Sequence, residues 1–152
     1  MTPVRASAAA VAVMLSLVLS GCATEIQEVS VPSYAESKNE LVALFDDTAQ
    51  LVGGDWTIDA FEGGGVCFVS EGVSGRSWSA ARSSPSEADP ELVAAQVRAD
   101  WEARGYAVEV RVTEGLGLHE VIVRGPYKFS ASLMAGPALI LLSGESACVE
   151  ER

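Results

Sequence analysis

Histidine is almost absent from this chain: His119 is the only one in 152 residues. A nucleophilic triad needs a histidine base, so only this residue could serve in one. It stands beside Glu120 near the start of an expected strand, where an isolated histidine is usually a surface or edge residue. The stretch Gly144–Cys148 (GESAC) superficially resembles a G-x-S-x-G nucleophile elbow, but it ends in cysteine and too few residues follow to form the required helix. We therefore expect no catalytic residue and no enzymatic activity.

Cysteine is also scarce, with only three residues, and no C-x-x-C spacing occurs. A zinc site would need more ligands than one histidine and unpaired cysteines supply. The calcium-loop pattern D-x-D-x-D-G and the phosphate-binding pattern G-x-x-x-x-G-K are both missing. These absences predict a protein without a metal ion or another cofactor.

Positive charge is the third shortage, since Lys and Arg together number 10 against 21 acidic residues. Lysine itself occurs only at Lys38 and Lys128. An acidic surface repels phosphate backbones, so the composition argues against binding to nucleic acid.

Long apolar runs are missing as well. The longest one, Ala8–Leu19, follows Arg5 and has about a dozen residues, whereas a membrane-spanning helix needs roughly 18 or more. A positively charged start followed by a short apolar stretch is typical of a secretory signal peptide. We expect residues 1–21 to be removed on export.

The end of this signal contains Leu19, Ser20, Gly21 and Cys22, which resemble the lipobox of bacterial lipoproteins. In that family the cysteine thiol receives a diacylglyceryl group and the chain is cut before it. Two acyl chains give stable anchoring without a spanning helix. Lipidation at Cys22 would place the protein on the extracytoplasmic side of the cell membrane. The alternatives are a plain signal peptide with an incidental cysteine, or an uncleaved anchor.

With Cys22 lipidated, Cys67 and Cys148 remain, in an exported and oxidising setting where disulfides form by default. We predict a structural disulfide between them. The alternative, a metal or redox pair, lacks further ligands and the usual spacing.

The expected organisation is a tether over residues 22–35 and a single globular domain over residues 36–152. The domain should begin with an amphipathic helix, capped by the box Ser37–Glu40 or by the same pattern at Ser33–Glu36, that ends before Gly53. A second helix should start after Asp89 with Pro90 in its first turn. Turn glycines and a period of two predict strands at 56–61, 66–70, 76–82, 106–113, 118–124, 128–134 and 138–144. This order, helix, three strands, helix, four strands, predicts an α+β fold in which two helices pack on one face of an antiparallel meander.

Aromatic side chains leave one binding function open. They could line an apolar groove on the open sheet face or between the helices and the sheet, although tryptophans more often serve as core anchors. An enclosed apolar cavity would favour a carrier or sensor of a small apolar molecule, whereas a filled core would count against it. The candidates are Trp56, Phe68, Trp78, Trp101 and Phe129.

Several stretches together resemble a group of small actinobacterial lipoproteins, in particular the LppA-like mycobacterial lipoproteins. They are LSGC, the glycine-flanked strand with Cys67, RSWSAAR, DPELVAAQVRADWEARGYAVEV and SGESACV. The resemblance implies an anchored extracytoplasmic domain with no established activity, and it transfers no catalytic residue. We expect a non-enzymatic interaction or accessory module of the bacterial cell envelope, held at the membrane through Cys22 and contacting an envelope protein.

Overall fold

The computed structural model describes residues 30–59 and 62–150. The predicted signal peptide, the lipobox and Cys22 lie outside the described residues. The elements follow the predicted order of helix, three strands, helix and four strands. They are α1 (Tyr34–Val52), β1 (Thr57–Ile58), β2 (Gly63–Ser70), β3 (Val73–Pro85), α2 (Pro90–Ala103), β4 (Val108–Thr113), β5 (Leu118–Arg124), the 3-10 turn η1 (Pro126–Lys128), β6 (Ser130–Ala135) and β7 (Leu139–Glu145).

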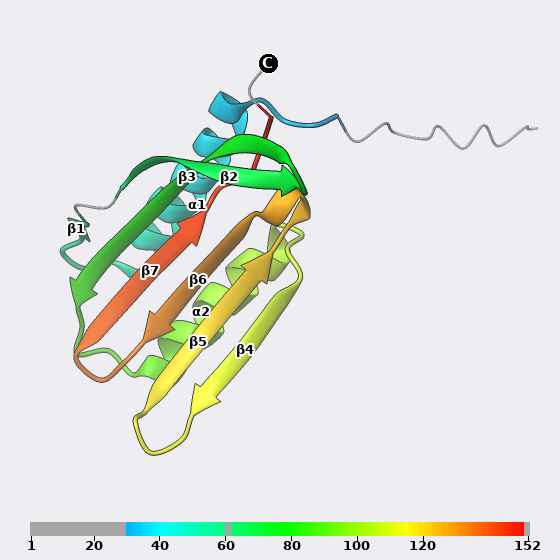
Figure 1. Cartoon of the computed structure of the whole chain (residues 1–152). Helices are drawn as coiled ribbons and strands as arrows, with labels where there is room; N and C mark the ends of the chain where they lie inside the picture. The colour runs from blue at the N-terminus through cyan, green and yellow to red at the C-terminus, as the bar shows by residue number, and fades with distance from the viewer. Residues whose placement is uncertain (1–29, 60–61, 151–152) are drawn as a thin grey trace, which may run out of the picture.

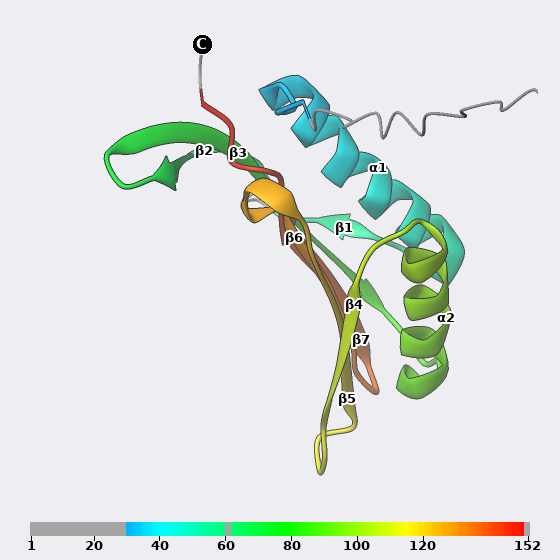
Figure 2. The same cartoon turned by 90° about the vertical axis from the view of Figure 1, so that its right-hand side faces the viewer.

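The seven strands form one antiparallel sheet (Figure 1). Strands β4 to β7 form a meander, and β7 then pairs with β3, which also pairs with β1 and β2. Both helices cover the same face: α1 packs on β3 and β7, and α2 packs on β4, β5 and β6 (Figure 2). The predicted α+β class is therefore confirmed, and the C-terminal strand joins the two halves of the sheet.

Helix α1 begins earlier than its first predicted boundary. The capping box is Ser33 with Glu36: the Ser33 hydroxyl accepts from the Glu36 N–H at 3.2 Å, and the Glu36 carboxylate accepts from the Ser33 N–H at 2.7 Å. Ser37, the alternative cap, is instead buried and donates its hydroxyl to the Ala147 carbonyl at 3.1 Å. The predicted tether, residues 22–35, is therefore too long, because its last residues belong to the cap and first turn of α1.

The core lies between the helices and the covered sheet face. Helix α1 buries its predicted apolar side, and α2 buries Val93, Val97 and Trp101 while Leu92 remains 68 % exposed. The buried side of α2 thus carries Trp101 and two valines, and burying this large apolar area stabilises the fold more than burying the opposite side would. The sheet supplies Val121, Val123, Ala131, Leu133, Ile140 and Leu142.

Strand β2 starts at Gly63, three residues before the predicted start at 66, and β3 continues to Pro85. Glycine has low strand propensity, which hid this part of β2 from sequence analysis. At Gly64 the missing side chain leaves room for the Tyr34 hydroxyl, which a Cβ at this position would displace.

Candidate functional site

Two adjoining hollows, of about 690 and 560 Å³, open at the end of the domain where the described chain begins. They share Ser30, Pro32 and Tyr127, and we call them together the tether-end groove. Its walls come from the start of α1, the loop after α2, and η1. The aromatic and charged side chains among its lining residues are Tyr34, Glu36, Glu40, Arg104, Tyr106, Arg124, Tyr127, Phe129 and Glu150.

The backbone of η1 is strained where it faces this groove. Tyr127 and Lys128 have φ of 55° and 67°, the left-handed region that residues other than glycine rarely occupy. The turn is held by its surroundings: the Cys148 N–H donates to the Tyr127 carbonyl at 2.7 Å, and the Lys128 ammonium donates to the Phe68 carbonyl. Such strain persists only where neighbouring structure enforces it, and it clusters at functional sites. It marks Tyr127 as a candidate contact residue.

The predicted disulfide between Cys67 and Cys148 is present and lies beside the groove, with 5.9 Å between the two Cα atoms. It joins β2 to the segment that follows β7. That segment also pairs with β3, because the Arg76 N–H donates to the Val149 carbonyl at 2.8 Å and the Val149 N–H donates to the Arg76 carbonyl at 3.0 Å. The covalent link and the backbone pairing thus fix the same end of the sheet.

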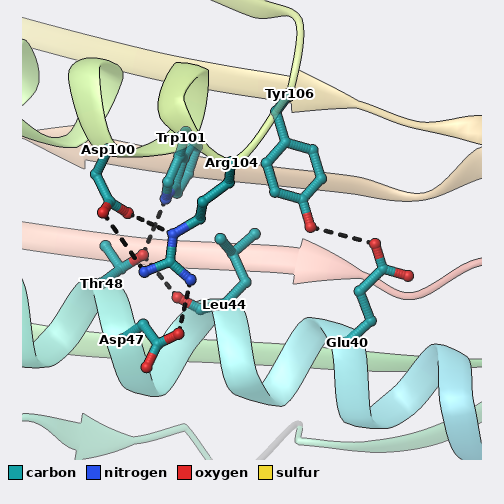
Figure 3. A network of polar contacts seen from close by, with 8 residues as sticks. All are labelled: Glu40, Leu44, Asp47, Thr48, Asp100, Trp101, Arg104 and Tyr106. Atoms are coloured by element: carbon teal, nitrogen blue, oxygen red, sulfur yellow. Dashed lines mark hydrogen bonds and ion pairs between the residues drawn. The ribbon is translucent and has the colours of Figure 1, made fainter.

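A network of polar contacts between α1 and α2 positions one wall of the groove (Figure 3). The Arg104 guanidinium donates to Asp47 at 2.6 Å and to Asp100 at 2.8 Å, and both carboxylates raise the pKa of Arg104. The Tyr106 hydroxyl donates to the Glu40 carboxylate at 3.2 Å. These contacts hold the loop after α2 against α1.

The ring of Tyr106 also stacks on Phe129, with 5.9 Å between the centroids. Its partial burial, together with the negative charge of Glu40, raises the pKa of Tyr106 to about 12 from an ordinary value of 10.0. The Tyr106 side chain is therefore held between Glu40 and Phe129, and its hydroxyl stays protonated well above neutral pH.

This shift predicts a loss of stability at high pH. The unfolded chain loses the Tyr106 proton near pH 10, whereas the folded chain keeps it until about pH 12. The stabilisation is therefore complete below pH 10 and disappears as the pH rises toward 12. Urea unfolding at pH 9 and pH 11 should show a larger fall in unfolding free energy for the wild type than for Tyr106→Phe. Equal falls in both proteins would contradict this assignment.

The sequence contained two features with a superficial likeness to catalytic residues, His119 and the GESAC stretch, and the structure brings neither into a catalytic arrangement. His119 is half-buried beside α2, in a hollow of about 430 Å³ whose lining residues include no serine or cysteine. Ser146 in the GESAC stretch is buried and accepts the Trp78 backbone N–H at 2.8 Å, while Cys148 is in the disulfide. Among residues 30–59 and 62–150, no group of three His, Cys, Asp or Glu side chains could hold a metal ion.

The predicted aromatic groove is not assembled. Trp101 and Phe129 are core residues, Trp56 and Trp78 are half-buried, and Phe68 is 62 % exposed on β2. Of the five candidates, Phe129 also lines the tether-end groove, together with Tyr34, Tyr106 and Tyr127. Sequence analysis missed these tyrosines because they come from three distant segments. In the described part of the chain, no helix has the length and apolarity needed to span a membrane.

Comparison with known proteins shows the fold alone. No family model matches the sequence, and no curated protein matches it. The structure resembles the crystal structure of a DUF4853 family protein from Actinomyces odontolyticus ATCC 17982, with a TM-score of 0.60 and 15 % sequence identity. The likeness covers 82 % of this chain and 72 % of that one. The α+β arrangement described above is thus similar to that of an experimentally determined protein structure.

Proposed function

We propose that this chain is a lipoprotein, anchored through Cys22 on the extracytoplasmic side of the cell membrane, and that it acts there as a non-enzymatic interaction module. The lipobox at Leu19, Ser20 and Gly21 supports the anchor. The Cys67–Cys148 disulfide supports export, because structural disulfides are typical of oxidising compartments and rare in the cytosol.

The observation that best supports an interaction role is the tether-end groove. Tyrosine and arginine are enriched in protein interfaces, and both line this groove. The described chain begins there at Ser30, eight peptide units after Cys22, a distance of at most about 29 Å when extended. An anchored domain would therefore keep the groove close to the bilayer, within reach of other envelope proteins.

The alternative, a carrier or sensor of a small apolar ligand, finds less support. The space between the helices and the sheet is filled by large side chains, including Trp101, Phe45 and Leu133, all fully buried. Three hollows of the described residues, of about 580, 690 and 560 Å³, are open at the surface and have charged residues in their walls. Such a carrier would need an enclosed apolar cavity.

The anchor is tested by replacing Cys22 with alanine. The variant should lose labelled palmitate completely and leave the membrane fraction or remain unprocessed, because the acceptor thiol is gone. Thr24→Ala, two residues beyond, is the matched control and should fractionate as the wild type does. Wild-type protein without lipid, or Cys22→Ala with lipid, would contradict the proposal.

The interaction role is tested in the same cells with a photoreactive phenylalanine derivative at Tyr127. Illumination should give discrete protein adducts in the anchored chain and far fewer in the Cys22→Ala background. The control position is Glu87, an exposed residue in the loop between β3 and α2 that lines neither hollow of the groove. Identical adduct patterns at Tyr127 and Glu87 would show that the groove has no special role.

A further inference from the structure

Strand β4 ends the sheet and has an open side. Within residues 30–59 and 62–150, it pairs only with β5, and no described helix or strand lies beyond it (Figures 1 and 2). An edge strand presents unpaired backbone N–H and C=O groups that can accept another strand. Edges of this kind are commonly blunted by proline, bulges or very short strands. Strand β4 has six residues, no proline, and unbroken pairing with β5.

The side of β4 that faces the helix layer is apolar and incompletely covered. Val110 pairs with Val121 and Val112 pairs with His119, which places both valines in rows that lead into the core. Nevertheless Val110 is 39 % exposed and Val112 is 54 % exposed. The hollow of about 430 Å³ between α2 and β4 leaves them open, and Ala95 and Ala99 of α2 line it as well.

The sequence of β4 is complementary to itself when it is read in the opposite direction. From Val108 to Val112 it is V-E-V-R-V, with Glu109 and Arg111 at equal distances from Val110. Both charged side chains are exposed and lie on the face of the sheet that the helices leave uncovered. Glu109 accepts from Arg111 at 2.7 Å and from Arg124 on β5 at 2.8 Å.

We infer that β4 pairs with β4 of a second copy of this chain, antiparallel and centred on Val110. In this register Glu109 lies opposite Arg111 of the second copy, and Arg111 lies opposite its Glu109. Val108 lies opposite Val112 twice, on the face toward the helices. Opposite charges and β-branched pairs directly across a strand pair are both stabilising.

Charge selects this register over its neighbours. A shift by two residues, which keeps every side chain on its own face, places Glu109 opposite Glu109 in one direction and Arg111 opposite Arg111 in the other. Like charges directly opposite are destabilising. The pairing also brings valines of the second copy toward the open hollow beside α2. The inferred partner is therefore an identical chain, bound in one orientation.

The test uses the full chain carrying two different affinity tags in one cell. Wild-type copies should co-purify. Glu109→Arg or Arg111→Glu alone puts like charges opposite each other in both pairs, and should weaken self-association about tenfold. A mixture of the Glu109→Arg chain with the Arg111→Glu chain restores both opposite-charge pairs and should co-purify as the wild type does. Glu114→Arg, in the turn after β4, is the matched control and should change nothing.

Circular dichroism establishes that each variant is folded. Folded variants that stay apart when mixed, or single variants that self-associate normally, overturn the inference. If a charge-reversed chain fails to fold, hydrogen exchange on the wild type decides the question. The outward-facing amides of β4 should gain protection as the protein concentration rises. Absence of that gain, or a wild type that stays monomeric, overturns the inference equally.

Discussion

Replacing Trp101 with alanine should lower the free energy of unfolding by about 3–5 kcal/mol. The side chain is fully buried on the face of α2 that packs on the sheet and on α1. Its indole N–H donates to the Thr48 hydroxyl at 3.0 Å, and that hydroxyl donates to the Leu44 carbonyl at 2.6 Å (Figure 3). Truncation removes apolar contacts from both helices at once and leaves a cavity that a packed interior cannot fully close.

Urea denaturation followed by far-UV circular dichroism, in a Cys22→Ala background that avoids the lipid, measures this loss. Leu92→Ala is the matched control on the same helix, because Leu92 is 68 % exposed and exposed substitutions usually stay within about 0.5 kcal/mol. A larger loss for Leu92→Ala than for Trp101→Ala would mean that α2 packs through a second apolar stripe, which contains Leu92, Ala95, Ala99 and Ala103.

The hydrogen bond and the packing can be separated. Thr48→Val keeps nearly the same volume but leaves the buried indole N–H without its acceptor, which costs about 1–3 kcal/mol. Trp101→Phe removes the donor itself and retains most of the apolar surface, so it should cost less than Trp101→Ala. If packing holds the two helices together, Trp101→Phe should cost less than Trp101→Ala in the same denaturation experiment. If the hydrogen bond holds them, the two substitutions should cost about the same.

The two helices show what periodicity can and cannot establish. Helix α1 has one apolar side, containing Leu41, Leu44 and Phe45, and this side is the buried one, as predicted. Helix α2 has two apolar stripes of similar width, so its sequence left both orientations open. Only the sheet, which accepts the stripe with Val97 and Trp101, decides between them.

The sheet also contains a buried arginine, which no local sequence pattern indicates. Arg82 is 9 % exposed and shares a row with Leu142 and Leu133, yet its guanidinium reaches Asp46 on α1 at 2.6 Å. From the sequence around it, an arginine in a strand is expected to face the solvent, so the burial of Arg82 could not be predicted. Its burial depends on a partner 36 residues away.

The candidate site was hidden for the same reason. Tyr34 lies at the start of a helix, Tyr106 in a loop and Tyr127 in a 3-10 turn. They line one groove because β7 pairs with both β3 and β6, and so joins the N-terminal and C-terminal parts of the chain in a single sheet. The cysteines were the exception, since export and the lack of further ligands already favoured the pair Cys67–Cys148.

Removing that disulfide should have the other large effect. Cys67→Ser/Cys148→Ser should lower the free energy of unfolding by about 4–5 kcal/mol in the chain-entropy model. The estimate follows from the sequence separation of 81 residues, which the bridge closes in the unfolded chain. For a domain of this size, the melting temperature should fall by roughly 10–20 °C.

The folded state should change little, because the segment with Cys148 keeps its backbone bonds without the bridge. The Ser146 N–H donates to the Trp78 carbonyl at 2.8 Å, in addition to the bonds between Val149 and Arg76. The bridge should therefore act mainly on the unfolded chain, and its loss should slow refolding more than it accelerates unfolding. Stopped-flow refolding of the double variant, with the reduced wild type as control, measures both rates. Two outcomes would contradict this expectation: faster unfolding with unchanged refolding, or a loss of unfolding free energy below about 1 kcal/mol with faster amide hydrogen exchange only in β2. Either would show that the bridge stabilises the β2–β3 hairpin locally rather than constraining the whole domain.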